Sequence, residues 1–147
     1  MWETSPSLPS QNAALFGARI ALSAVFVIAG TSQLGDYTAT QVYLETSGVT
    51  ARLLPPAIAL QIAFGLLLAA GLFSRISAGG LALFSLLAAW LFHMDLADPM
   101  QRVVFLKDLA IAGGLLAIVG TGPGEWSVDW ARSVKLQADR ARTSAMG

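Results

Sequence analysis

Lys107 and Asp108 stand side by side near the start of an otherwise apolar stretch, FLKDLAIAGGLLAIVG. Neighbouring residues on a helix point about 100° apart, so these two charges do not pair well with each other and each serves a different neighbour. A charge at the centre of a bilayer costs about 2.5–3.5 kcal/mol on insertion scales, and less near the surface, where a lysine stem can extend to water. Both residues therefore indicate polar partners on other segments.

Polar residues of the other apolar segments fall at the same depth. If the chain crosses a membrane four times, as its hydropathy indicates, these residues form one layer towards the outer, periplasmic ends of the helices: Gln33, Asp36, Gln61, His93, Asp95, Lys107 and Asp108. Within this layer we expect Lys107 to reach Asp36 or Asp95. Intramembrane ionisable residues of this kind mark functional sites or paired structural contacts.

His93 is the only histidine of the chain. Asp95 and Asp98 follow it closely, but one imidazole with two carboxylates in a loop is a weak match to zinc-ligand spacing, so we predict no metal site. A histidine that forms a hydrogen bond across helices, or that passes a proton at the membrane face, fits better. We expect Asp108 to accept a hydrogen bond from His93 or from Gln61.

The polar layer has two main interpretations. Its members can be structural clamps that fix helix register, although buried charged pairs are often close to neutral for stability. They can instead line a pocket that binds a small ligand or a quinone headgroup between the helices. A third interpretation is that the charged chains only extend to the membrane surface. The candidate ligand-binding residues are Lys107, Asp108, His93, Gln61, Gln33 and Asp36. No residue is assigned a catalytic role.

The composition indicates a membrane protein. The chain has 147 residues, of which 55% are hydrophobic and 12% charged, and its mean hydropathy is +0.64. The formal net charge is zero and no Lys/Arg-rich block occurs, which argues against a nucleic-acid partner. There is no cysteine, which excludes disulfides, thiolate nucleophiles, haem attachment through cysteine and iron–sulfur ligation. We expect no covalent cofactor, so any redox chemistry needs a separately bound one.

The elements that must position the polar layer are membrane-spanning helices, each of which needs about 20 mostly apolar residues. The segments that come near this length are 13–34, 54–73, 76–93 and 103–120. We therefore predict an all-α fold, a four-helix bundle in the membrane with a short interfacial helix after it. Ser74 and Arg75 form the tight turn between the second and third spans. The polar connection 35–52 is about long enough for a surface helix with Tyr43 and Leu44 on its wetter or lipid-facing side.

The domain organisation follows from these spans: an N-terminal tail (1–12), a transmembrane domain (13–120) and an amphipathic C-terminal segment (121–147). Trp126 and Trp130 suit one face of an interfacial helix. The tail lacks the basic region of a cleaved signal, so the first helix is expected to be retained. The basic residues on the side of the two termini are Arg75, Arg132, Lys135, Arg140 and Arg142, whereas the other side carries Arg52 and Arg102. By the positive-inside rule, both termini are predicted to be cytoplasmic.

Two further features concern packing. Small residues recur at a spacing of four, as in the pairs Ala110/Gly114, Gly113/Ala117 and Gln61/Gly65, and such pairs let helix backbones approach closely in lipid. Arg19 lies about two turns into the first span from the side of the termini. We expect it either to extend to the membrane surface or to pair with Asp129 or Glu125 as the C-terminal segment folds back.

The sequence resembles the DoxX family of small four-helix bacterial membrane proteins. The resemblance runs from about Arg19 to Asp129 and rests on the order and spacing of short motifs: RIALSAVFVIAGTSQL, SGVTARLLP, GLLLAAGLFSRISAG, WLFH, FLKDLAIAGGLLAI and GPGEWSVD. It implies a bacterial inner-membrane location. The residues that match the family pattern are Arg75, His93, Lys107, Gly113 and Gly114.

The resemblance also implies an association with membrane redox systems, because the family is similar to subunits associated with thiosulfate:quinone oxidoreductase. Other membrane or redox subunits are the implied partners, besides the lipid bilayer. Two positions depart from the family pattern: Gln61 replaces a common acidic residue, and Gln33 replaces a frequent lysine. Both changes remove a titratable group. The alternative is a structural or assembly subunit without chemistry, and a solute carrier or channel is the least supported class.

Overall fold

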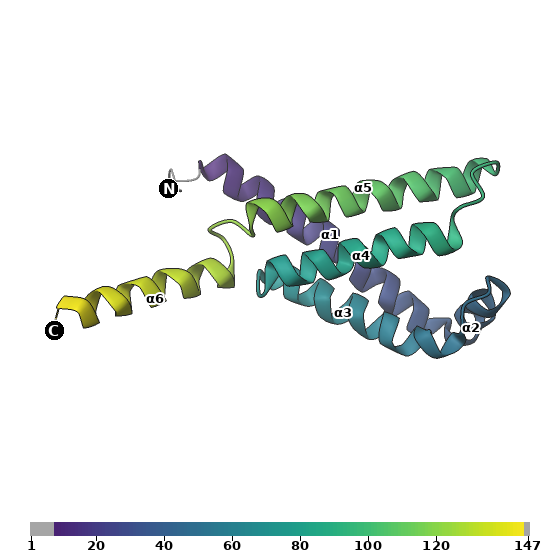
Figure 1. Cartoon of the computed structure of the whole chain (residues 1–147), viewed down its shortest axis with the longest axis horizontal. Helices are drawn as coiled ribbons and strands as arrows, with labels where there is room; N and C mark the ends of the chain where they lie inside the picture. The colour runs from purple at the N-terminus through teal and green to yellow at the C-terminus, as the bar shows by residue number, and fades with distance from the viewer. Residues whose placement is uncertain (1–7, 146–147) are drawn as a thin grey trace.

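The computed structural model describes residues 8–145, which form α-helices, one short 3₁₀ helix and no strand (Figure 1). The prediction of an all-α fold is confirmed. In chain order the elements are α1 (Pro9–Gly35), α2 (Tyr37–Thr46), η1 (Ala51–Leu53), α3 (Leu54–Ala70), α4 (Ser74–Phe92), α5 (Pro99–Thr121) and α6 (Val128–Ala145).

Four helices are long and apolar enough to cross a membrane: α1, η1 with α3, α4 and α5. They coincide with the predicted spans to within a few residues. α5 begins at Pro99, earlier than expected, because Asp98 caps it: its carboxylate accepts a hydrogen bond from the backbone N–H of Met100 at 2.8 Å. α3 ends at Ala70 because Gly71 adopts a left-handed conformation, with φ of 71°.

The turn between α3 and α4 differs from the prediction. Ser74 and Arg75, expected to form it, are the first two residues of α4, and the turn is made by residues 71–73. The reason lies in a distant segment: the Asp129 carboxylate accepts hydrogen bonds from the backbone N–H groups of Phe73 (2.9 Å) and Ser74 (2.8 Å). An N-terminal cap supplied from α6 therefore sets where α4 begins.

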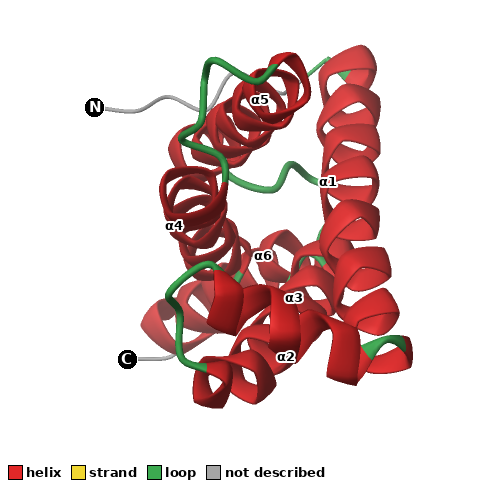
Figure 2. Cartoon of the chain, turned by 90° about the vertical axis from the view of Figure 1, so that its right-hand side faces the viewer, coloured by secondary structure: helices red, strands yellow, loops and turns green. Residues whose placement is uncertain are grey.

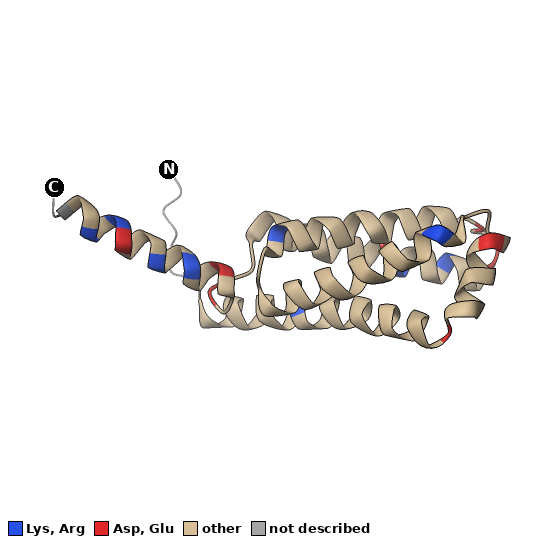
Figure 3. Ribbon diagram, turned by 90° about the horizontal axis from the view of Figure 1, so that it is seen from below, with Lys and Arg blue, Asp and Glu red and all other residues tan. Residues whose placement is uncertain are grey.

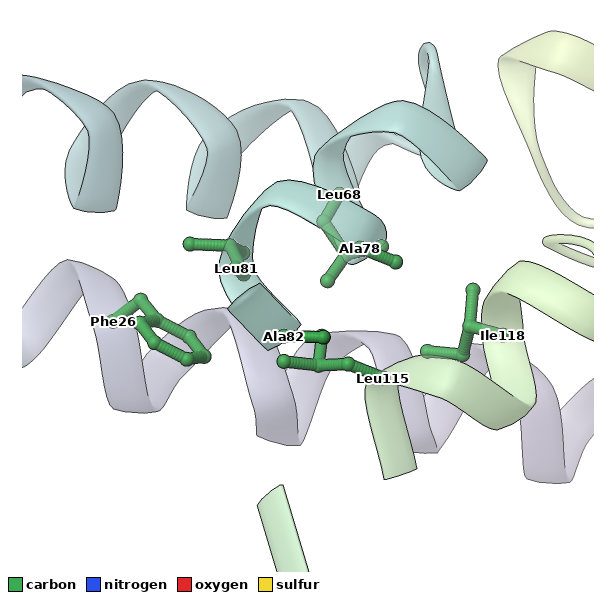
Figure 4. Close-up of a cluster of buried hydrophobic side chains, with 7 residues drawn as sticks. All are labelled: Phe26, Leu68, Ala78, Leu81, Ala82, Leu115 and Ile118. Carbon is green, nitrogen blue, oxygen red and sulfur yellow. The ribbon is translucent and has the colours of Figure 1, made fainter. Parts of the chain in front are cut away.

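The bundle consists of two tightly packed helix pairs. α4 packs chiefly against α5 and α1 against α3, while α3 and α4 join the two pairs (Figure 2). Their shared core is a cluster of buried side chains from all four helices (Figure 4): Phe26, Leu68, Ala78, Leu81, Ala82, Leu115 and Ile118. Large apolar residues on the outside, such as Ile28, Leu66 and Trp90, are more than half exposed. An apolar exterior of this extent fits a lipid environment.

Small residues at a spacing of four were predicted to let helices approach closely, and one of the three predicted pairs does so. A Cβ added to Gly65 of α3 would lie 2.8 Å from Cγ2 of Val27 on α1, so these helices meet closely there. At Gly114 the same atom would make ordinary contacts with Leu22, and at Gly113 it would meet nothing within 4 Å. The prediction is wrong for Gly113, which lies on a face of α5 that no other part of the described chain covers.

The surface helix predicted between the first two spans is α2, but one of its faces was assigned wrongly. Leu44, expected on the wetter or lipid-facing side, is only 9% exposed and packs with Leu54 and Ile58. Tyr43 is half exposed, as expected for a surface position, and its ring lies against that of Phe92 with centroids 5.6 Å apart. α2 thus packs against α3 and α4 at this end of the bundle rather than lying loosely beside it.

The start of α1 and the whole of α6 lie at the opposite end of the bundle from α2 (Figure 1). α1 already begins at Pro9, so only residues up to 8 of the predicted tail precede a helix, and residues 1–7 and 146–147 lie outside the described range. α6 has 18 residues and continues away from the bundle, carrying most of the basic residues of this end (Figure 3). Trp126 precedes α6, and a membrane-surface position for both tryptophans stays a prediction.

Candidate functional site

A cavity of about 330 Å³ opens at the α2 end of the bundle. It is walled by α1, α2, α3 and α4, and most of its lining is apolar. Apolar lining residues include Leu44, Leu54, Phe84, Leu87, Leu91 and Phe92, and the polar ones are Gln33, Thr40, Tyr43, Gln61 and His93. A mostly apolar cavity with a few polar groups is the usual form of a small-molecule site.

Two glutamine side chains form a hydrogen-bonded pair in the cavity wall. Gln61 of α3 is 2% exposed, and its Nε2 donates to Oε1 of Gln33 on α1 at 3.1 Å. Each amide nitrogen carries two N–H groups, so the second N–H of Gln61 and both of Gln33 are not used in this contact. The pair thus offers further donors without carrying a charge.

His93 connects the cavity to α5. Its Nδ1 lies 2.9 Å from Oδ2 of Asp108, and both side chains are largely buried, at 20% and 15% exposure. When Asp108 is ionised, its carboxylate can only accept, so Nδ1 is then the donor and Nε2 is left for another partner. Ser85 of α4 donates to the backbone carbonyl of Asp108 at 2.9 Å and fixes the two helices at the same level. Of the two partners expected for Asp108, the structure gives His93, whereas Gln61 donates to Gln33.

Lys107 and Asp36 lie apart from this arrangement. Lys107 is exposed on the outside of α5, about two turns from the start of the helix, and forms no ion pair with any residue in the range 8–145. Asp36 is exposed at the junction of α1 and α2, where its backbone carbonyl accepts hydrogen bonds from Thr40. The expected pairing of Lys107 with Asp36 or Asp95 is not formed.

The structure thus brings together part of the predicted set. Gln33, Gln61 and His93 line one cavity, and Asp108 stands behind His93. Thr40, Tyr43 and Leu44 also line it and were missed. Their spacing of three and four residues is typical of one face of a helix and could have indicated that they point to the same side.

Metal binding has no visible ligand set in this region. Within residues 8–145, no group of three or more His, Asp or Glu side chains is placed to hold a metal ion. The two carboxylates that follow His93 take part in local backbone contacts: Asp95 accepts from the N–H of Ala97 at 3.3 Å and Asp98 caps α5.

Comparison with known proteins gives the family. A profile of the DoxX family matches residues 14–94, more than half of the chain. The chain belongs to the DoxX family. It is 39% identical to the inner membrane protein YqjF of Escherichia coli (strain K12) over 112 residues, which cover 76% of this chain and 86% of YqjF. It is 29% identical over 120 residues to the inner membrane protein YphA of the same organism, covering 76% of this chain and 85% of YphA. No solved structure matches the chain.

These findings describe a DoxX-family protein of the inner membrane with four apolar spanning helices. The family profile covers α1 to α4 and ends just after His93, so it includes the glutamine pair and the histidine of the cavity. Asp108, the partner of His93, lies beyond that match, on α5.

The other end of this DoxX-family protein is held by a buried arginine. Arg19 is 1% exposed, and its guanidinium donates from Nη1 to the carbonyl of Pro123 and from Nη2 to that of Trp126, both at 2.8 Å. It also lies over the ring of Phe16, 5.5 Å from its centroid. Of the two expectations for Arg19, extension to the membrane surface or contact with a C-terminal segment that folds back, the structure shows the second. The direct partners, however, are backbone carbonyls rather than carboxylates.

Asp129 completes this end. Besides the backbone N–H groups of Phe73 and Ser74, it accepts a hydrogen bond from the Ser74 hydroxyl at 2.8 Å. Burial alone would raise the pKa of Asp129, but the hydrogen bonds from Ser74 and Phe73, together with the charge of Arg132, outweigh it, so its pKa lies below the ordinary 3.8. Asp129 is therefore a structural group that ties α6 to the turn between α3 and α4.

Proposed function

We propose that this protein binds the headgroup of a quinone in the cavity at the α2 end and serves a quinone-linked redox system of the membrane. The observation that carries the proposal is the mixed character of this cavity. Its walls are aliphatic and aromatic, while its polar groups are the amides of Gln33 and Gln61, the imidazole of His93 and the hydroxyls of Thr40 and Tyr43. A quinone has the same division, with two carbonyl oxygens on an apolar ring and tail.

The donors suit these carbonyl oxygens. A quinone carbonyl can only accept hydrogen bonds, and the glutamine pair keeps N–H groups that its mutual bond does not use. His93 can act at the same ligand through Nε2 while Asp108 holds its Nδ1. The volume of about 330 Å³ lies at the small end of the range for ligand sites and fits a headgroup better than a whole molecule.

The glutamines limit the chemistry that this site offers. Neither Gln33 nor Gln61 titrates, so they bind and orient a ligand without exchanging protons. Within the described chain, the titratable side chains that line the cavity are Tyr43 and His93, and His93 is bound to Asp108. The imidazole of His93 is the group suited to exchange a proton with a bound ligand. From the distribution of basic residues, this end faces the periplasm.

Binding of a short-chain ubiquinone tests the proposal. Protein in detergent is titrated with the quinone, and binding is followed by quenching of tryptophan fluorescence. Gln61→Leu and His93→Leu are expected to weaken binding at least tenfold, because each removes a polar group from the cavity. Asp36→Asn, at the same end but outside the cavity, is the matched control and should bind like the wild type. Unchanged affinity in both cavity variants, with folding intact, excludes this function.

The exposed position of Lys107 supports a second candidate function, that of an assembly subunit in a larger membrane complex. An exposed ammonium about two turns into a spanning helix, without an ion pair in the described chain, is suited to a carboxylate of another membrane polypeptide. Under this function, Lys107→Leu lowers the amount of copurifying polypeptides and leaves quinone binding unchanged. Recovery of the wild-type protein without any stoichiometric partner counts against it.

A further inference from the structure

A second and larger cavity, of about 760 Å³, lies at the end of the bundle where α1 and α6 begin. Its wall combines the first turns of α1, the start of α4, the loop after α5 and the start of α6. This cavity shares no residue with the one at the α2 end. The redox function proposed above makes no use of it.

The charges around this cavity are of both signs. Arg75 is exposed and forms no ion pair within residues 8–145, and its guanidinium lies against the backbone of Gly122, where an added Cβ would be 3.5 Å from Nη2. Glu125 and Asp129 also line the cavity. Both carboxylates are fixed by the fold: Glu125 accepts from Nδ2 of Asn12 at 3.0 Å, and Asp129 accepts from Phe73 and Ser74.

The position of these charges relates them to the membrane surface. Arg75 is the second residue of α4, and Gly122 directly follows α5, so the cavity lies where two spans begin and end. Its apolar wall includes Leu15 of α1, and Trp130 lines it from α6. Phospholipid headgroups, with their glycerol and upper acyl chains, occupy this level of a bilayer.

We propose that this cavity binds a zwitterionic phospholipid whose headgroup carries a primary ammonium, that is, a phosphatidylethanolamine. The phosphate lies at the Arg75 guanidinium, which can bind it through two N–H groups. The ammonium lies on the side of Glu125 and Asp129, and the acyl chains pass along Leu15. The Glu125 carboxylate disfavours a headgroup that is only anionic, and Arg75 disfavours one that is only cationic.

Competition between two lipids tests this assignment. The purified protein is exchanged into micelles with equal amounts of dioleoyl-phosphatidylethanolamine and dioleoyl-phosphatidylglycerol, and retained lipid is counted by native mass spectrometry. The wild type is expected to retain the ethanolamine lipid at least fivefold over the glycerol lipid. Arg75→Gln should lose most of this retention. Arg102→Gln, which removes an exposed arginine at the opposite end, should retain lipid like the wild type.

Glu125→Gln tests the second half of the site. Glutamine keeps an acceptor for Asn12 but removes the charge, so the preference for ethanolamine over glycerol lipid should fall at least threefold. Equal retention of both lipids by the wild type overturns the proposal, as does wild-type retention by Arg75→Gln and by the charge reversal Arg75→Glu. A third overturning result is Arg75-dependent binding of water-soluble glycerophosphoethanolamine without retention of the intact lipid, because the ligand would then be a soluble metabolite.

Discussion

Arg19 and Trp126 lie 107 positions apart in the chain, and a 2.8 Å hydrogen bond joins the guanidinium of the first to the carbonyl of the second. A parallel bond reaches the carbonyl of Pro123, so one side chain of α1 holds both ends of a short loop segment between α5 and α6. This loop lacks the regular hydrogen bonds of a helix, and buried carbonyls need partners. Arg19 supplies them, and a cation inside an apolar helix thereby has a structural explanation.

Arg19→Met is expected to destabilise the protein strongly. Methionine fills a similar space, but it leaves two carbonyl groups without their donors, and each costs about 1–3 kcal/mol. Thermal unfolding in detergent should show a clear fall in melting temperature, and protease should cut the segment 122–127 faster. Arg140→Gln is the control, because Arg140 is exposed on α6 and its loss should change neither property. Equal melting temperatures for Arg19→Met and the wild type contradict this role.

The Asp129 cap predicts a loss of stability in acid. The pKa of Asp129 in the folded protein lies below its ordinary value of 3.8, so the folded state binds this proton less readily than the unfolded state. Its stabilising contribution is complete above pH 3.8 and is lost as the pH falls through the lowered value. We expect Asp129→Asn to be less stable at pH 7 and to show a smaller fall in melting temperature than the wild type as the pH is lowered through and below 3.8. Parallel pH curves for variant and wild type contradict the prediction.

The spans and the polar contacts between them were predictable to different degrees. Hydrophobic length alone located the four spanning helices, since crossing a bilayer demands it. The bond between His93 and Asp108 was one of two alternatives expected, because a charge at membrane depth needs a polar partner on another helix. The expected pairs of Lys107 were not formed, because its side chain points out of the bundle. The position of a residue along a spanning helix fixes its depth in the membrane. The direction in which its side chain points depends on how the helices pack.

The wrong predictions for Leu44 and for the start of α4 also arise because the deciding contacts come from other parts of the chain. Leu44 was placed on the outside because α2 is short and mostly polar, yet it packs on Leu54 and Ile58 where the chain turns back into the bundle. The start of α4 was missed because its cap, Asp129, lies 55 residues away from Ser74. Local signals such as a proline or a glycine cannot report a cap contributed from another part of the chain.

The contact between His93 and Asp108 should appear as a coupling energy. His93→Ala, Asp108→Ala and the double variant form a cycle in which the interaction term is expected to be about 0.5–3 kcal/mol, the range for residues in direct contact. The free energy of unfolding can be followed by circular dichroism in increasing SDS. The pair His93→Ala and Asp129→Ala, at opposite ends of the bundle, serves as control and should be additive within about 0.5 kcal/mol. Additivity in the first cycle would show that the 2.9 Å contact contributes nothing measurable.

Gly80 and Gly113 offer a matched test of helix packing, since both are glycines within spanning helices. A Cβ on Gly80 of α4 would overlap the ring of Phe64 on α3, approaching its Cδ2 to 2.7 Å, and at Gly113 the same atom would meet nothing within 4 Å. Gly80→Ala should therefore cost about 1–3 kcal/mol, because α3 and α4 must separate or the ring must leave its place. Gly113→Ala should be neutral or stabilising by up to about 1 kcal/mol, through helix propensity alone. Thermal unfolding of both variants in the same detergent makes the comparison, and a Gly80→Ala protein as stable as Gly113→Ala would mean that α3 and α4 do not meet at Phe64.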